Sequence, residues 1–333
     1  MNSPFFSIII PVYNGLTHDL PICLNSIWVQ PLDKSLYEVI CIDDCSTDDT
    51  RAWLKEQQKL HNNLYIIENE KNIRQGGCRN KGVKAARGKY ILFIDQDDYY
   101  HKDCFIKVYN HLQENNLEIL IVDCAYQSPG KESNKLQHNF PHREIMTGDE
   151  IIEKNSIPYA PWKFIFLRSY MIERKLFFAE NERIEDVDWV HKLVHYAQQV
   201  QYQPILFIHY NKTSISTTMT SYKSRETVYS TLRLSKRMYE MLFTIFASSN
   251  KDVKAEIERI ANMMKYLGLR NYLFFYDNAK IKANNIKQHL SIAKSGNCLV
   301  KFAQKMPYLY SIISNVLSPF GQLAMYVYRH IKY

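Results

Sequence analysis

The sequence predicts an α/β protein with a mainly parallel sheet in its first 220 residues, followed by a helical C-terminal region. Over the first 100 residues, short apolar runs rich in β-branched and aromatic residues alternate with longer polar segments of helical composition. Strands that alternate with helices are joined by right-handed crossovers, which cover both faces of a parallel sheet. After about residue 220 the pattern is almost continuously helical until Ser295 and Gly296.

The expected elements follow one another in that order. The expected strands are Ser7–Val12, Glu38–Ile42, Leu64–Ile67, Tyr90–Ile94 and, further along, Gln201–Tyr210. The expected helices are Thr50–Leu60, Gly77–Ala86, Trp162–Leu176 and Glu185–Ala197. We divide the chain into a catalytic domain at 1–220, a helical region at 221–300 and a basic, aromatic, amphipathic tail at 301–333.

Composition excludes several classes of protein. At 333 residues and 46% hydrophobic content the chain can bury a substantial core, so we do not expect disorder. Its seven cysteines include no CxxC pair, which argues against a disulfide framework or a zinc site and favours a reduced, cytoplasmic protein. The first residues lack the pattern of a secretory signal, and we expect no nucleic acid partner.

The net charge of +8 arises in the C-terminal region alone. Residues 278–333 contain eight Lys or Arg and no Asp or Glu, which leaves 42 − 8 = 34 basic against 34 acidic residues elsewhere. Residues 306–328 carry no charge and many apolar and aromatic side chains, interrupted by polar residues near Pro319. We expect this tail to lie on an anionic, cytoplasmic membrane face without spanning it. The alternative is packing on the catalytic domain or in a dimer.

Acidic and polar residues follow three of the expected strands. Tyr13 and Asn14 follow the first strand, the pair Asp43–Asp44 follows the second, and the cluster 95–98 follows the fourth. Ligands of parallel sheets bind at these carboxyl ends. The clustered carboxylates of Asp95, Asp97 and Asp98 repel one another unless a cation such as magnesium or manganese neutralises them. The alternative is an acidic turn that caps the next helix.

The second strand end is ambiguous in the same way. Asp48 and Thr50 are placed to cap the helix that follows. Asp43 and Asp44 precede the cap, where they could accept hydrogen bonds from a nucleobase imide or a ribose hydroxyl.

Together, four segments resemble the family 2 glycosyltransferases, which have the GT-A fold and invert the anomeric centre. They are Ser7–Asn14, Glu38–Asp48, Arg79–Tyr90 and Phe93–Asp98, in the order and spacing of the family. The resemblance covers roughly residues 5–215 and fades over the rest of the chain.

The resemblance implies a nucleotide-sugar site at the strand ends. The residues that it assigns to the nucleotide are Pro11, Tyr13, Asn14, Asp43 and Asp44. Asp95 and Asp97 would form the DXD motif, which holds the ribose and a Mn²⁺ or Mg²⁺ ion on the diphosphate, with Asp98 in support. Cys45 stands where the family often has glycine, so the turn there is expected to differ.

The remaining roles also come from the resemblance. Asp186, in the sequence Glu185-Asp186, matches the family's general base, although acids at a helix N-terminus are favoured by the helix dipole alone. Asp188 would then be the exposed member of the group. His209 would be a further metal ligand or a structural histidine, and Trp162 would contact the acceptor or pack in the core.

The implied function is an inverting, metal-dependent hexosyltransferase of surface polysaccharide synthesis. It would move a sugar from a nucleotide diphosphate donor, a UDP-sugar by expectation, to a glycan or lipid-linked acceptor. A nucleotidyltransferase on a similar sheet is the first alternative, although Asn14-Gly15-Leu16-Thr17 lacks the basic, glycine-rich loop of that class. A non-catalytic sugar-nucleotide-binding protein is the second. A dinucleotide dehydrogenase is excluded because no GxGxxG follows the first strand.

Overall fold

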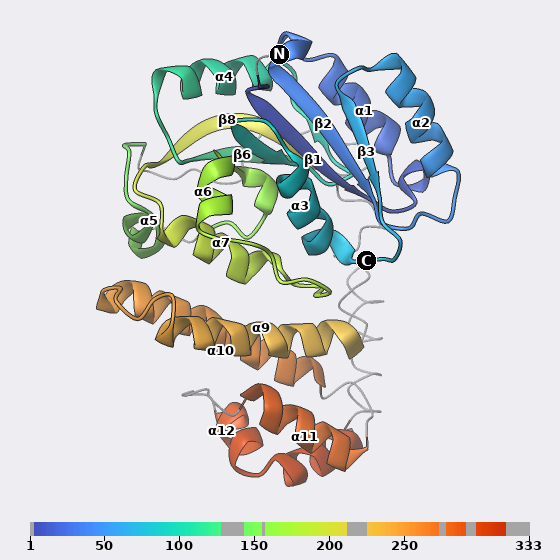
Figure 1. The fold of residues 1–333 in the computed structure, drawn as a ribbon. Helices are drawn as coiled ribbons and strands as arrows, with labels where there is room; N and C mark the ends of the chain where they lie inside the picture. Colours follow the sequence, from blue (N-terminus) through green and yellow to red (C-terminus); the bar gives the residue numbers. More distant parts are fainter. Residues whose placement is uncertain are drawn as a thin grey trace. The chain divides into compact units, whose positions relative to one another are not determined.

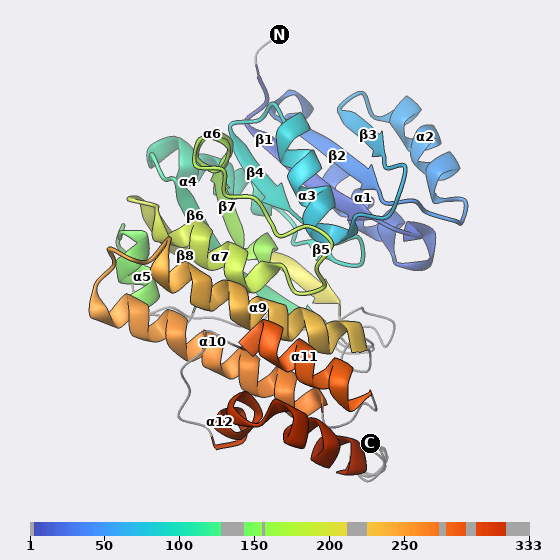
Figure 2. The same cartoon turned by 60° about the horizontal axis from the view of Figure 1, so that its bottom comes forward.

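The structure is a computed structural model that describes residues 3–127, 143–154, 157–211, 225–272, 278–290 and 298–317. The chain forms two compact units, Met1–Ser216 and Thr217–Tyr333. Figures 1 and 2 show the elements of both units.

The first unit contains an eight-stranded sheet with the order β3-β2-β1-β4-β7-β6-β8-β5. The first four strands are β1 Phe6–Val12, β2 Tyr37–Asp43, β3 Leu64–Glu68 and β4 Tyr90–Phe93. They pair in parallel, with β1 between β2 and β4 and with β3 outside β2. The four strands predicted in this half of the sheet are therefore confirmed, apart from one residue at their ends.

The second half makes the sheet mixed rather than mainly parallel. Its strands are β5 Tyr99–Tyr100, β6 Ile119–Gln127, β7 Phe164–Leu167 and β8 Val200–Asn211. Strand β7 is antiparallel to both β4 and β6, β5 is antiparallel to β8, and β6 and β8 are parallel. The helix predicted from Trp162 is wrong over β7, because a short apolar run fits a buried strand and a helix equally well.

Helices cover both faces of this sheet. The α-helices are α1 Leu20–Trp28, α2 Thr50–Leu60, α3 Arg74–Ala85, α4 Cys104–Glu114, α5 Gly148–Lys154, α6 Arg168–Glu173 and α7 Asp186–His195. Three short 3₁₀ turns lie at η1 Gly15–Thr17, η2 Lys34–Leu36 and η3 Pro161–Lys163.

The alternation of side chains along β1 assigns these helices to faces. A Cβ added to Gly82 would lie 2.4 Å from Ile9 Cγ2, so α3 packs closely on the face of Ile9. Phe6, on the opposite face of β1, contacts Phe105 of α4 with ring centroids 6.3 Å apart. Phe93 is in register with Ile9 and contacts a tryptophan of α7. Helices α3 and α7 therefore share one face, as Figure 1 also shows.

The second unit is helical, as predicted. It contains α9 Arg225–Phe243, α10 Lys251–Tyr272, α11 Ala279–Leu290, α12 Cys298–Lys305 and a further helix at 307–317. One core contains side chains from all of these helices: Val228, Leu232, Leu269, Tyr272, Ile286, Val300, Ala303 and Tyr310. This core continues across residue 300, where the sequence suggested a boundary. Within the described part of the chain, no helix has the length and apolarity needed to cross a membrane.

Candidate active site

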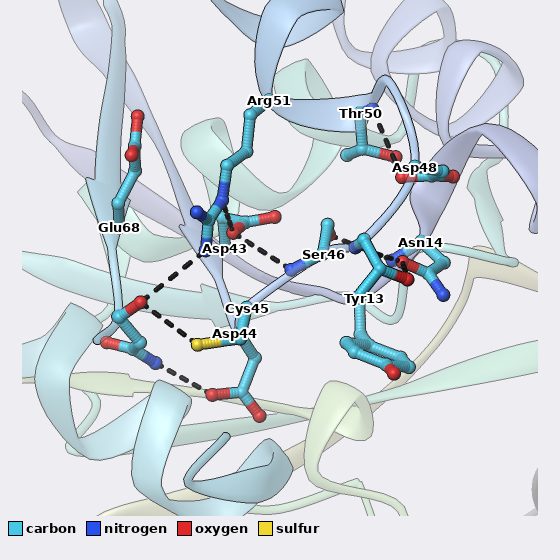
Figure 3. Close-up of polar contacts among 12 residues, drawn as sticks. Tyr13, Asn14, Asp43, Asp44, Cys45, Ser46, Asp48, Thr50, Arg51 and Glu68 are labelled. Carbon is cyan, nitrogen blue, oxygen red and sulfur yellow. Dashed lines mark hydrogen bonds and ion pairs between the residues drawn. The ribbon is translucent and has the colours of Figure 1, made fainter. Parts of the chain in front are cut away.

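Hydrogen bonds join the three strand ends at one edge of the sheet. The side-chain amide of Gln96 accepts from the Tyr13 N–H and donates to the Tyr13 carbonyl, both at 2.9 Å. The Asn14 N–H donates to Ser46 Oγ at 2.9 Å, and Asn14 Oδ1 accepts from the Thr47 N–H at 2.8 Å (Figure 3). Asn14 thus connects the turn after β1 to the loop after β2.

Tyr13 and Pro11 differ in how far they are exposed at this edge. The side chain of Tyr13 is 44% exposed, so its ring is open to a ligand. Pro11 lies within β1, where it is buried and in register with Ile42. At the start of α2 the N-cap residue is Asp49, whose side chain makes no capping bond, so the capping role predicted for Asp48 and Thr50 is wrong. Asp48 Oδ1 accepts from the Thr50 N–H at 3.1 Å just before the helix, and Thr50 Oγ1 accepts from the Leu16 N–H at 3.2 Å.

Asp43 is completely buried, and only one of its two carboxylate oxygens has hydrogen-bond partners among the described residues. Its Oδ2 accepts from Arg51 Nε at 2.5 Å and from the Ser46 N–H at 3.2 Å (Figure 3). Its Oδ1 has no hydrogen-bond partner among the described residues. An acceptor left unpaired in the interior costs free energy until a donor reaches it.

Asp44 organises the segment before α3. Its Oδ1 accepts from Asn69 Nδ2 at 2.9 Å and from the Ile73 N–H at 2.8 Å, and its Oδ2 accepts from the Arg74 N–H at 2.8 Å. These three bonds use most of the capacity of a carboxylate. The sequence did not predict this role for Asp44.

Cys45 keeps the backbone conformation that glycine would favour. Its φ of 66° lies in the left-handed region, and its thiol donates to the Asn69 carbonyl at 3.2 Å. The turn therefore retains the left-handed residue, and the expected difference at this position is confined to the side chain. A side chain in this region costs about 1–2 kcal/mol.

The acids after β4 lie in a poorly solvated environment. Asp98 is 1% exposed, and its Oδ1 accepts from the Asn211 N–H of β8 at 2.9 Å. Burial, reinforced by Asp95, raises the pKa of Asp97 to about 6. Burial and the neighbouring acids also raise the pKa of Asp98 well above its ordinary value. The cluster therefore carries negative charge that it compensates poorly.

Arg79 of α3 joins these acids to the acids at the start of α7. Its Nη2 lies 2.7 Å from Asp95 Oδ1, and its Nη1 lies 2.9 Å from Glu185 Oε1. The guanidinium is buried, with its centre 5.8 Å from the ring of Phe93 and 5.4 Å from that of Phe178. Residues 106 positions apart in sequence, Arg79 and Glu185, thereby meet beside the DXD motif.

Asp186 is the first residue of α7 and is half-buried. Burial raises its pKa, and the nearby Arg79 opposes that shift. Asp188 is only 1% exposed and lies 3.8 Å from Lys192 Nζ, so the expectation that it would be the exposed acid is wrong. On α7 it is turned about 200° from Asp186, and this direction points into the protein.

His209 and Trp162 lie in aromatic surroundings. His209 Nε2 is 2.8 Å from His101 Nδ1, and its ring stacks on Tyr99 with centroids 4.8 Å apart. Trp162 is 6% exposed and stacks on Tyr210 at 5.9 Å. No group of three or more His, Cys, Asp or Glu side chains in the described ranges is arranged to hold a metal.

Two residues that form ion pairs in this site could not be predicted from the sequence. Arg79 lies in a segment that carried the family resemblance, but no role was inferred for it. Arg51, which binds Asp43, gave no signal beyond its place in a helix of ordinary composition.

Comparisons with known proteins agree with this architecture. The model of the family described as Glycosyl transferase family 2 matches residues 7–175. The poly(ribitol-phosphate) beta-glucosyltransferase of Bacillus spizizenii is 41% identical over 117 residues, which cover 34% of this chain and 18% of that protein. The chain spans well under two thirds of the length of this relative.

Two solved structures share the fold. Staphylococcus aureus TarS 1-349 in complex with UDP-GlcNAc has a TM-score of 0.65 at 19% identity, covering 95% of this chain and 92% of that chain. The mannosyltransferase PcManGT from Pyrobaculum calidifontis, in complex with GDP-Man and Mn²⁺, has a TM-score of 0.52 at 13% identity, covering 96% and 88%. The fold is therefore of the GT-A type. With a family match over more than half of its residues, the chain belongs to glycosyl transferase family 2.

Proposed function

We propose that this chain is an inverting glycosyltransferase that moves a sugar from a UDP-sugar donor to a hydroxyl group of a cell-surface polymer. The observation that carries the proposal is the single guanidinium of Arg79 between Asp95 and Glu185. It brings the DXD motif next to the acid pair at the start of α7. A displacement at an anomeric carbon needs these two functions, donor binding and proton acceptance, on either side of one bond.

The nucleotide would bind at the ends of β1 and β2. The exposed ring of Tyr13 offers a surface on which a base can stack. The Oδ1 of Asp43 lacks a hydrogen-bond partner among the described residues, but it is buried, so the imide N–H of uracil would reach it only after the side chains around it move aside. Arg51 holds the other oxygen of this carboxylate through its Nε. TarS, with the same fold, is described in complex with UDP-GlcNAc, which supports a uridine donor.

A divalent metal fits the acids after β4 only in part. The raised pKa values of Asp97 and Asp98 indicate negative charge that a hard cation would neutralise. The described residues do not gather three ligands, so the diphosphate oxygens of the donor would complete the coordination. Asp97 is the ligand that we propose. His209 is the second protein ligand that we propose, and its Nε2 already contacts His101 Nδ1 at 2.8 Å. When bound, Mn²⁺ or Mg²⁺ would neutralise charge on the leaving diphosphate.

Asp186 would act as the general base. Its carboxylate would take the proton of the acceptor hydroxyl while that oxygen forms a bond to the anomeric carbon. The bond from this carbon to the diphosphate oxygen breaks, and the UDP leaves with the electron pair. Attack from the face opposite the leaving group inverts the anomeric centre. A raised pKa makes Asp186 a stronger base than an ordinary aspartate.

The acceptor class is suggested by a relative. A protein that is 41% identical to part of this chain is named a poly(ribitol-phosphate) beta-glucosyltransferase. We infer an acceptor of the same general kind, a hydroxyl of a polyol-phosphate or glycan polymer, free or lipid-linked. Trp162 would contribute to acceptor binding through its neighbour Tyr210, because Trp162 itself is almost fully buried.

A donor panel tests the proposed function. Purified full-length protein is incubated with UDP-, GDP- and dTDP-sugars and Mn²⁺, with and without poly(ribitol phosphate), and release of nucleoside diphosphate is measured. We expect acceptor-dependent release from a UDP-sugar and a product with the anomeric configuration inverted. Release of sugar 1-phosphate in place of nucleoside diphosphate would instead indicate a nucleotidyltransferase, and tight donor binding without turnover would indicate a non-catalytic protein.

We also propose that the end of the chain binds an anionic membrane surface. In the helix at 307–317, Tyr310, Ser311 and Ser314 are buried, so the polar serines face the protein. The exposed large side chains of this stretch are all apolar: Met306, Tyr308, Leu309, Ile312, Ile313, Val316 and Leu317. The exposed Lys301 and Lys305 lie just before it. Residues 318–333 of the expected tail lie outside the described residues.

Substitutions on the full chain test the membrane proposal better than a truncation. A truncation before α12 would remove Val300, Ala303 and Tyr310 from the core of the second unit. Ile312→Glu with Val316→Glu should reduce sedimentation with phosphatidylglycerol vesicles at least tenfold. Phe243→Glu, on a residue that is 71% exposed at the end of α9, is the matched control. Equal sedimentation of all three proteins, or none, would contradict the proposal.

A further inference from the structure

We propose that Arg79 is a positioning residue, which holds the carboxylate of the donor site and the acid pair of α7 at a fixed separation. The inference rests on the proposed function and adds a role for a residue whose guanidinium contacts Asp95 and Glu185. Arg79 would act through Asp95 and through Glu185, the neighbour of Asp186. The structure supports this role by the geometry of the guanidinium, by the packing around it and by the chemistry of its two partners.

Both terminal nitrogens of the Arg79 guanidinium donate hydrogen bonds to carboxylates. One terminal nitrogen donates to Asp95 at 2.7 Å, and the other donates to Glu185 at 2.9 Å. Asp95 comes from the loop after β4, whereas Glu185 immediately precedes α7. The planar fork of an arginine sets both the distance and the angle between two carboxylates. A lysine in the same place is a point charge and would hold one partner well and the other poorly.

The packing around Arg79 restricts its movement. The adjacent Asn80 donates to the Phe178 carbonyl at 3.1 Å and accepts from the Phe178 N–H at 2.9 Å. The ring of Phe178 in turn covers the guanidinium. One turn earlier, a Cβ on Gly76 would lie 2.9 Å from Glu185 Cγ, so α3 lies directly against the acid. Helix α3 therefore fixes the whole segment from Phe178 to Glu185.

The locations of Asp95 and Glu185, the two partners of Arg79, favour a positioning role over a purely stabilising one. Asp95 keeps 20% of its side chain exposed at the edge where the donor would bind. Glu185 is 5% exposed and continues directly into Asp186. Apolar residues of similar volume often stabilise a fold as well as a buried ion pair does. The presence of an arginine between these two carboxylates is therefore explained better by a need to fix their separation than by a gain in the stability of the fold.

Arg87 offers a control within the same helix-to-strand segment, on a side chain that is 55% exposed where that of Arg79 is 2% exposed. Its guanidinium pairs with Glu38 at 2.8 Å and lies 4.7 Å from the ring centroid of Tyr65. It thus makes the same kinds of interaction as Arg79, an ion pair and an aromatic contact. Its partners belong to β2 and β3 and include none of the acids assigned to catalysis or to the donor.

The experiment separates binding from turnover. Full-length Arg79→Lys and Arg87→Lys are compared with the natural protein for UDP affinity by calorimetry and for kcat and KM of transfer. We expect Arg79→Lys to weaken UDP binding far less than it lowers kcat, because Asp95 loses one partner whereas the contacts of the base at β1 and β2 remain. Its kcat should fall about 100-fold, the usual effect of misplacing a reacting group by 1 Å. Arg87→Lys should change kcat less than twofold.

Glu185→Asp provides a second test that leaves Arg79 in place. The carboxyl group becomes one methylene shorter and moves away from Arg79, so kcat should fall about as far while UDP affinity is kept. If Arg79→Lys does not fold, this variant alone decides the question. When both variants fold, their combination should cost little more than either one, since each breaks the same link.

Three results would overturn the inference. The first is a kcat in either variant equal to that of the natural protein. The second is a variant that loses UDP affinity but keeps its kcat. The third is a combined variant whose loss of kcat, expressed as a free energy, equals the sum of the two single losses. Failure of the proposed function is distinguishable from all three, because the natural protein itself would then show no turnover of any nucleotide sugar. A loss of activity in Arg87→Lys equal to that in Arg79→Lys would point to general destabilisation and would also overturn the inference.

Discussion

Replacing Asp186 with asparagine should stop transfer and at the same time stabilise the fold. Burial raises the pKa of this carboxyl from 3.8 to about 6, so the charged form is disfavoured in the folded protein. A shift of about 2 pH units corresponds to about 3 kcal/mol. Because the side chain is only half-buried, solvent screens part of this penalty, and we expect about 1–2 kcal/mol.

The sign of the effect gives it a characteristic pH dependence. The folded pKa lies above the unfolded one, so the destabilisation is absent below about pH 4 and complete above about pH 6. Asp186→Asn should therefore raise the melting temperature by roughly 2–8 °C at pH 7 and leave it unchanged at pH 4. Over the same range, transfer by the natural protein should fall as the pH drops below 6, since a protonated base cannot accept a proton.

The assay combines melting curves at both pH values, calorimetry with UDP and the rate of transfer. Asp186→Asn should bind UDP normally and lose about two to four orders of magnitude in rate. Asp188→Asn is the comparison, because this acid is buried beside Lys192 and should affect stability rather than chemistry. Normal transfer by Asp186→Asn with loss in Asp188→Asn, or equal stability changes at pH 4 and pH 7, would refute the reasoning.

Three further predictions concern other parts of the molecule. Asp97→Ala should abolish turnover, as should EDTA with the natural protein, because the leaving diphosphate would lose its counter-charge; full activity in EDTA would contradict the proposed metal. Cys45→Gly should stabilise the first unit by about 0.5–1 kcal/mol in urea unfolding, since glycine adopts a φ of 66° without strain but loses more chain entropy. Lys265 is fully buried, and burial lowers its pKa from 10.5 to about 8, so its charge is disfavoured in the folded protein. The natural protein should therefore gain stability relative to Lys265→Met as the pH rises from 8 to 10.5, where the unfolded lysine also becomes neutral, and a stability difference that is independent of pH would count against the burial argument.

The sequence predicted the parallel half of the sheet and the polar strand ends because both depend on local patterns. A buried strand followed by acids, as in β4 and Asp95, can be recognised from a few neighbouring residues. The antiparallel strand β7 could not be recognised, since its four apolar residues give no period that separates a strand from a helix. The direction of Asp188 was missed for a related reason: an acid near the start of a helix is usually exposed, and here tertiary packing overrides that tendency.

The site also contains relations between distant residues, which no local pattern encodes. Asp44, for which the sequence predicts a ligand contact, also accepts hydrogen bonds from the Ile73 and Arg74 N–H groups at the start of α3. The same helix carries Arg79, which lies less than two turns after Arg74 and donates to Asp95 and Glu185. Asp44 therefore binds the start of the same helix, α3, whose Arg79 contacts the acid pair of α7. A substitution of Asp44 should therefore lower kcat by moving Arg79, in addition to any effect on nucleotide binding. Such a coupling between distant residues can be seen only in the three-dimensional structure.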